Sequence, residues 1–189
     1  MYRTSSYFIS KTLCDVLPMR IIPALLLGGI TYYMIGFNPP IENFLWFLLT
    51  LVEVSIVAGS MCLLISSFVP SLSLGNLIAI ILLLFYMLFG GFLVNKSSMP
   101  AALRWFSWVS FIEYGFEILM VNELENAIII FDPKGDTNVN VTVNGIVFLQ
   151  QFDMDPDRFY IDFVALALMA ATYLMGAYLL LRFFIKEKR

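Results

Sequence analysis

The sequence contains no histidine, only two cysteines among 189 residues, and few charged side chains, which make up 13% of the chain. Without histidine, zinc sites and Ser-His-Asp triads lose their commonest ligand and base, so we expect no metal site and no catalytic residues. Cys14 and Cys62 lie outside the loop that we place on the outer face below, so we expect no disulfide framework. The net charge of −3 argues against a nucleic-acid partner.

Apolar residues are abundant instead, at 60% of the chain, whereas a soluble domain has about 45–50%. Four runs are long enough to cross a bilayer as a helix, which takes about 20 apolar residues. A single run of this kind can be a buried core helix, but four of them in one short chain favour a membrane protein. The runs are Ile21–Phe37, Phe44–Val69, Ser71–Asn95 and Phe163–Leu181.

The distribution of Lys and Arg predicts the orientation of these helices. Residues 1–20 and the tail after Leu181 are basic, whereas acidic residues crowd between Glu113 and Asp157. Because four crossings leave both ends on one side, we expect an integral protein of the plasma or an organelle membrane with both termini cytosolic. The expected domains are a cytosolic segment at 1–20, three transmembrane helices at 21–95, an extracellular loop domain at 96–160, and the last helix with its basic tail at 161–189.

The expected outer loop has local signals of its own. Residues 101–112 have wide apolar coverage, which is typical of a short re-entrant helix, and residues 116–126 continue a helical pattern. Ile128–Phe131 and 139–143 are predicted strands, and Asn144-Gly145 predicts a hairpin turn into a further strand at 146–149. The predicted fold is therefore an all-α polytopic membrane protein with four transmembrane helices, an extracellular re-entrant helix and a small loop domain.

A few polar positions stand out from this background. Asn140 begins an Asn-Val-Thr sequon in the outer loop and is a candidate glycosylation site. Glu53 is the one ionisable residue deep in a run, where a charge costs about 2.5–3.5 kcal/mol on insertion scales. Glu53 either takes part in a polar relay or substrate path, or is a protonated, hydrogen-bonded residue with a structural role. Asn76 on the next run is its candidate partner. The pairs Gly28-Gly29 and Gly90-Gly91 predict close packing between helices.

Several short motifs occur in a fixed order along nearly the whole chain, apart from about 126–155. They are Tyr2–Lys11 followed by Asp15–Arg20 and Pro23, Gly90–Asn95, Trp105 with Ser110-Phe111, Tyr114–Glu117, Asn122-Glu123, Arg158–Phe163 and the tail 182–189. This series resembles the C-terminal part of the transmembrane domain of the ABC transporter G subfamily, the white-type half transporters.

The resemblance implies an exporter membrane domain with the last four of six helices. It also implies an ABC ATPase domain that binds ATP and Mg outside this chain, so that Met1 is expected to begin a fragment or a truncated gene model. The implied partners are this ATPase domain, a second half transporter in a homo- or heterodimer, and membrane lipids. No cofactor is expected in the chain itself, which has no phosphate-binding Gly-x-x-x-x-Gly-Lys-Ser/Thr motif.

The resemblance also assigns roles to individual residues. The coupling segment that touches the ATPase domain carries Tyr2, Arg3, Ser6, Tyr7 and Lys11. The wall of the substrate cavity carries Leu77, Ile80, Leu84 and Met87, whose spacing puts them on one helix face. Phe92 and Leu93 correspond to a plug above the cavity. The alternative for the wall is plain packing or contact with lipid. The family's multidrug member has cysteines in the outer loop, and this loop has none.

Three functions remain open at this stage. The first is the membrane part of a G-type exporter for a lipophilic substrate (a lipid, sterol or xenobiotic), powered by the missing ATPase domain. The second is a truncated membrane subunit that only binds partner half transporters. The third, a stand-alone channel or scramblase, has the least support because no run carries a strong polar stripe.

Overall fold

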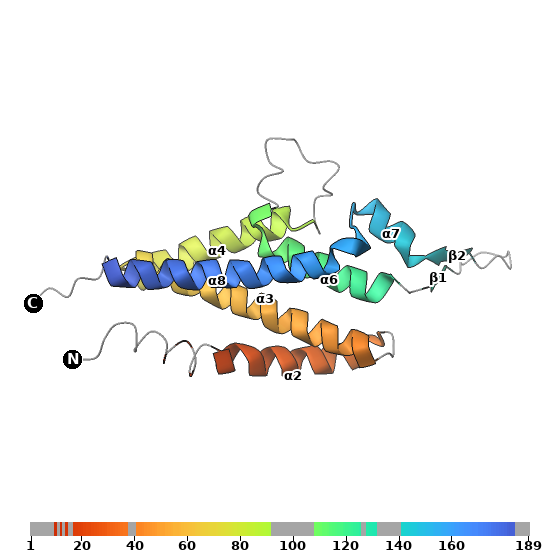
Figure 1. Cartoon of the computed structure of the whole chain (residues 1–189), viewed down its shortest axis with the longest axis horizontal. Helices are drawn as coiled ribbons and strands as arrows, with labels where there is room; N and C mark the ends of the chain where they lie inside the picture. The colour runs from red at the N-terminus through yellow and green to blue at the C-terminus, as the bar shows by residue number, and fades with distance from the viewer. Residues whose placement is uncertain are drawn as a thin grey trace, which may run out of the picture.

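The computed structural model describes residues 10, 12, 14, 17–37, 41–91, 108–125, 128–131 and 141–183. Within these ranges, four helices are long and apolar enough to cross a membrane, which confirms the four predicted transmembrane helices. They are α2 (Leu17–Ile35), α3 (Ile41–Phe68), α4 (Leu72–Phe89) and α8 (Phe159–Phe183). Figure 1 shows them running along the long axis in alternating directions, so that α2 begins and α8 ends toward the same end of the bundle.

Helix α3 is the centre of the bundle. Helices α2, α6 (Phe111–Leu124) and α8 pack against it, and each brings a glycine to the contact. A Cβ atom added at Gly28, Gly115 or Gly176 would lie 2.7, 2.6 or 2.8 Å from an α3 side chain. The α3 side chains at these three contacts are Leu48, Val54 and Leu64. Small residues let membrane helices approach closely, so these glycines fix which sides of α2, α6 and α8 face α3.

The predicted role of the glycine pairs in helix packing is therefore confirmed for one glycine of each pair, Gly28 and Gly90. Gly28 packs against α3, but Gly29 has nothing within 4 Å of an added Cβ. Gly90 approaches Ile112 of α6, where an added Cβ would lie 3.0 Å from Cγ2. Gly91 meets nothing within 4 Å and has a φ of +76°, so its role is to end a helix.

This ending corrects the predicted third run, Ser71–Asn95. Helix α4 stops at Phe89, Gly90 follows as its C-cap, and Gly91 turns the backbone into the left-handed region. The apolar side chains that follow made the run look continuous, because hydropathy does not register backbone conformation. Residues 92–95 lie outside the described part of the chain.

The main core lies where α3, α6 and α8 meet. Its fully buried members include Val57 of α3, Ile118 of α6 and Leu166 of α8. A smaller cluster lies beyond it, where Leu149 and Met154 pack against Val121 of α6. The second cluster fastens the segment after α6 to the end of the bundle.

That segment contains the only described strands. β1 (Ile128–Phe131) pairs antiparallel with β2 (Val141–Asn144), with Ile128 opposite Asn144. The first predicted strand is confirmed in full. The second is confirmed over 141–143 and extends to Asn144, and residues 139 and 140 lie outside the described part of the chain. Figure 1 shows this pair at the end of the molecule away from the start of α2.

The predicted hairpin turn at Asn144-Gly145 is wrong. Gly145 begins a helix, α7 (Gly145–Gln151), so residues 146–149 are helical and not a third strand. Gly145 and Leu149 are buried while Ile146 and Val147 are exposed, which is the spacing of one helix face. Burial of Leu149 against Val121 outweighs the β-propensity of this apolar stretch.

The helical prediction for 116–126 is confirmed by α6, which reaches Leu124. The predicted helix at 101–112 is not continuous, since Ser110 interrupts it and Ile112 belongs to α6. Residues 101–107, with Trp105, lie outside the described ranges. A 3-10 turn, η3 (Pro156–Arg158), leads into α8.

Candidate functional site

The predicted cavity wall lies on α4 and faces out of the chain. Leu77, Ile80, Leu84 and Met87 are 56, 61, 59 and 43% exposed. Helical spacing does put them on one face, as predicted. In the described part of the chain this face forms an open apolar surface, which we call the α4 face.

Two polar contacts hold α4 against the bundle from its other side. The Tyr86 hydroxyl lies 3.3 Å from the Tyr173 hydroxyl of α8. The Ser110 hydroxyl donates a hydrogen bond of 3.0 Å to the backbone carbonyl of Tyr86. Phe89, at the end of α4, is the one buried residue of this helix. The opposite side of α4 is thereby attached to α8 and to the start of α6, and the α4 face remains uncovered.

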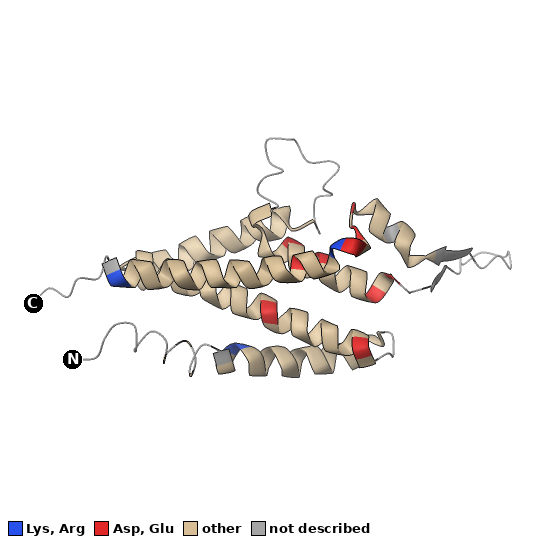
Figure 2. Cartoon of the chain, viewed as in Figure 1, with Lys and Arg blue, Asp and Glu red and all other residues tan. Residues whose placement is uncertain are grey.

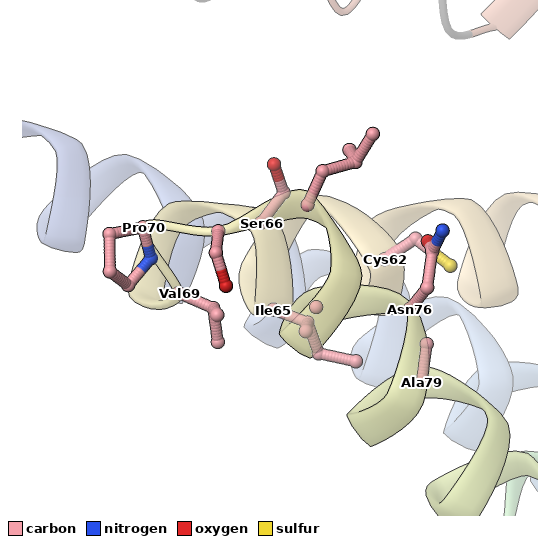
Figure 3. Close-up of a pocket in the computed structure, with 10 residues that line it drawn as sticks. Cys62, Ile65, Ser66, Val69, Pro70, Asn76 and Ala79 are labelled. Carbon is pink, nitrogen blue, oxygen red and sulfur yellow. The ribbon is translucent and has the colours of Figure 1, made fainter.

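A cavity of about 300 Å³ does exist beside α4, but it lies at the helix start. It opens around the turn between α3 and α4, and its lining includes Cys62 and Ser66 of α3 and Asn76 and Ala79 of α4. Figure 3 shows the Cys62 side chain beside that of Asn76. None of the four residues of the α4 face lines this cavity. The predicted wall and the cavity within the chain are therefore two different places.

The structure does not bring Glu53 and Asn76 together. Asn76 lies opposite Cys62, which is nine residues, or about 13.5 Å, further along α3 than Glu53. Glu53 is half-buried in the middle of α3, and its Oε2 atom is buried without a hydrogen-bond partner among the described residues. A carboxyl at this depth has to face protein, face water or carry a proton.

Sequence reasoning missed a buried acidic group between α6 and α8. Glu113 and Glu117 of α6 and Asp162 of α8 are only 6, 3 and 2% exposed. Glu117 Oε1 accepts a hydrogen bond of 3.4 Å from the backbone N–H of Asp155, which ties α6 to the segment before η3. The available signal was the four-residue spacing of the two glutamates within an otherwise apolar helix.

A second missed contact joins α3 to α6. Asn43 Nδ2 donates to the backbone carbonyl of Asn122 at 3.1 Å, and Asn122 Nδ2 donates to the carbonyl of Asn43 at 3.0 Å. This reciprocal pair fastens the first turn of α3 to the last turn of α6.

Several predicted sites lie outside the described residues. They are the coupling residues Tyr2, Arg3, Ser6, Tyr7 and Lys11, the plug residues Phe92 and Leu93, and the sequon residue Asn140. In the part of the chain that the structure describes, no group of three or more His, Cys, Asp or Glu side chains could hold a metal ion.

Comparison with known proteins places this arrangement in a family. Residues 1–124 match the family model described as ABC-2 type transporter. The ABC transporter G family member 24 of Dictyostelium discoideum is 43% identical over 189 residues, which cover 100% of this chain and 16% of that protein. The broad substrate specificity ATP-binding cassette transporter ABCG2 of Bos taurus is 37% identical over 194 residues, covering 98% of this chain and 29% of that protein.

Similarity extends to the protein white of Ceratitis capitata, which is 28% identical over 193 residues and matches 100% of this chain. The chain spans less than a third of the length of each of these three relatives. The family model covers most of the chain, and the relatives cover all or nearly all of it. The chain is therefore an integral membrane protein that belongs to the ABC-2 type transporter family, as part of the transmembrane domain of a G-type ABC transporter.

Proposed function

We propose that this chain forms part of the membrane domain of an exporter that moves a lipophilic compound out of the cytosol or the inner leaflet. The observation that carries the proposal is the uncovered α4 face, with its four apolar side chains. A second half transporter, identical or different, supplies the opposite wall, and the compound binds between the two. A wall without polar groups suits a lipid, a sterol or a flat xenobiotic, since binding pockets are lined mainly by apolar side chains.

The energy for export comes, in this proposal, from an ABC ATPase domain outside these 189 residues. The residues present do not suit ATP and Mg, because the chain has no P-loop motif to hold phosphates. The coupling residues between Tyr2 and Lys11 receive the motion of that domain, and Phe92 and Leu93 close the cavity on its far side. We expect no ATP hydrolysis by the purified chain, and measurable turnover would contradict this assignment.

The proposed orientation has cytosolic termini. Figure 2 shows basic residues of the described chain where α2 begins and α8 ends, while most acidic residues lie on α6 and in the segment before α8. Exceptions in the described ranges are Arg158 of η3, which lies among these acids, and Glu42 and Glu53 of α3. This asymmetry agrees with the tendency of Lys and Arg to stay on the cytosolic side. A C-terminal tag should therefore resist protease added to intact cells and become cleavable after permeabilisation. Cleavage in intact cells would reverse the orientation.

The test of the α4 face is Leu84→Trp in the full-length transporter. Overpacking costs about 1–3 kcal/mol, so a Trp that fills the shared cavity should lower export by about tenfold or more at unchanged surface level. The matched control is Ile78→Trp, which lies about 120° around α4 from Leu84 and should export normally. Normal export by Leu84→Trp, or equal loss in both variants, would remove the α4 face from the substrate path.

A further inference from the structure

A second cavity, unrelated to the α4 face, lies at the acidic end of the bundle. It has a volume of about 410 Å³ and forms where α3 and α8 begin and where α6 ends. Its lining includes three carboxylates and three aromatic rings. They are Glu42, Glu125 and Asp157, and Trp46, Phe159 and Tyr160. The volume falls in the range of about 300–1,000 Å³ that is usual for small-molecule sites.

The three carboxylates come from separate parts of the chain. Glu42 lies in the first turn of α3, Glu125 follows α6, and Asp157 belongs to η3. None of them forms an ion pair with a Lys or Arg among the described residues, although the exposed Arg158 lies next to Asp157 in the sequence. Because no Lys or Arg of the described residues lines the cavity, its three solvent-exposed acids give it a negative potential that favours a cationic ligand.

The aromatic rings form one wall of the same cavity. The Trp46 ring meets Phe159 and Tyr160 edge to face, with centroids 5.3 and 6.0 Å apart. The faces of such rings are electronegative and attract cations, and aromatic walls are the usual sites for quaternary ammonium groups. A metal ion does not fit this combination, because no three acids in the described chain converge closely enough to ligate one.

The cavity is held in shape before any ligand arrives. Asn43 and Asn122 also line it, and their reciprocal hydrogen bonds of 3.1 and 3.0 Å fix the start of α3 against the end of α6. Trp46 packs edge to face against Phe163 of α8 as well, with centroids 5.8 Å apart. A preformed site avoids part of the ordering cost of binding.

From this combination we propose that the cavity binds a quaternary ammonium group, with the three carboxylates neutralising its charge and the aromatic wall contacting its methyl groups. The helices that form it begin at Ile41 and Phe159, so the cavity lies at the end of the membrane spans, at the depth of lipid headgroups. A free organic cation such as choline and the choline headgroup of a phospholipid carry this same chemistry.

The experiment measures binding of radiolabelled choline to the full-length transporter in nanodiscs of phosphatidylglycerol, which contains no choline. We expect saturable binding that tetramethylammonium displaces and that the neutral isostere 3,3-dimethylbutan-1-ol does not. The double variant Glu125→Gln/Asp157→Asn should bind about tenfold more weakly, and Tyr160→Leu about threefold. Asp153→Asn, an exposed acid nearby that does not line the cavity, should leave binding unchanged.

Nanodiscs of phosphatidylcholine distinguish the two sources of the group. Loss of free choline binding in these discs means that lipid headgroups occupy the cavity, and unchanged binding means that it takes a soluble cation. The proposal fails if no saturable binding occurs in phosphatidylglycerol discs, if the neutral isostere competes as well as choline, or if the carboxamide variant binds like the wild type. The carboxamide variant removes no packing, so it keeps the test valid even if Tyr160→Leu unfolds the protein.

Discussion

Helices α3 and α4 are equally apolar, yet the chain uses them in opposite ways. Seven of the 28 residues of α3 are buried within the chain, compared with one of the 18 residues of α4. Helix α3 is surrounded by α2, α6 and α8, each with a glycine against it, whereas α4 is attached along one side and leaves eleven large apolar side chains exposed, including the four of the α4 face. The contrast separates two roles: α3 holds the chain together, and α4 is available for contacts beyond it.

The largest expected effect comes from breaking the packing on α3. In Gly115→Leu the new side chain meets Val54, because even a Cβ would lie 2.6 Å from Val54 Cγ2. We expect loss of folded, monodisperse protein in size-exclusion chromatography, since such overpacking costs about 1–3 kcal/mol or more.

The matched control is Gly29→Leu on α2, where an added Cβ meets nothing within 4 Å, and this variant should stay folded. A smaller change sharpens the test: Val54→Ala should restore the stability lost in Gly115→Ala. If Gly115→Leu behaves like Gly29→Leu, the contact between α6 and α3 is not tight and α3 is not the centre of the chain.

A pair of identical substitutions compares the two environments directly. Leu166 of α8 is 0% exposed beside α3, and Leu84 on the α4 face is 59% exposed. Leu166→Ala should lower the free energy of unfolding by about 2 kcal/mol, the lower end for buried leucines, because lipid also solvates apolar surface. Leu84→Ala should change it by less than about 0.5 kcal/mol.

Reversible denaturation in mixed micelles, with the chain in its full-length protein, gives both values. Equal losses in the two variants would mean that α4 is packed within its own chain as firmly as α8 is, and the distinction between the helices would disappear.

The smallest effect concerns the polar tie between α4 and α8. Tyr86→Phe removes a hydroxyl that lies 3.3 Å from the Tyr173 hydroxyl. Hydrogen bonds between membrane helices contribute about 0.6 kcal/mol on average, so the melting temperature should fall only slightly. Tyr33→Phe, whose side chain is 76% exposed, is the control and should melt like the wild type. A loss above about 2 kcal/mol in Tyr86→Phe would show that α4 depends on this tie.

Much of the fold could be predicted from the sequence because lipid imposes a simple rule on it. A backbone within lipid has to satisfy its hydrogen bonds internally, so long apolar runs form helices, and all four were found with small errors at the ends. The errors came from backbone geometry and tertiary packing. Gly91 ends α4 through its positive φ, and Leu149 draws an apolar stretch into a helix by burying against α6.

The candidate site was less predictable, because hydropathy does not say what a helix faces. The spacing of Leu77, Ile80 and Leu84 correctly gave one face, but only the structure places that face outside the chain. Likewise, Glu53 and Asn76 lie on helices that are neighbours in sequence, but at different depths along them. The cavity beside Trp46 draws residues from three separate segments of the chain, and no sequence pattern brings such residues together.

The position of α3 at the centre also has a consequence for biogenesis. Helix α3 is complete at residue 68, but the partners that occupy two of its sides, α6 and α8, are synthesised much later. During translation, the sides of α3 that receive Gly115 and Gly176 therefore stay open to lipid or to a membrane chaperone. In a nascent chain halted before α8, the finished helices are apolar enough to stay in the bilayer. The side of α3 that packs against α8 in the complete chain would then have no partner helix. Such a surface is a simple mark by which quality control could recognise an incomplete chain.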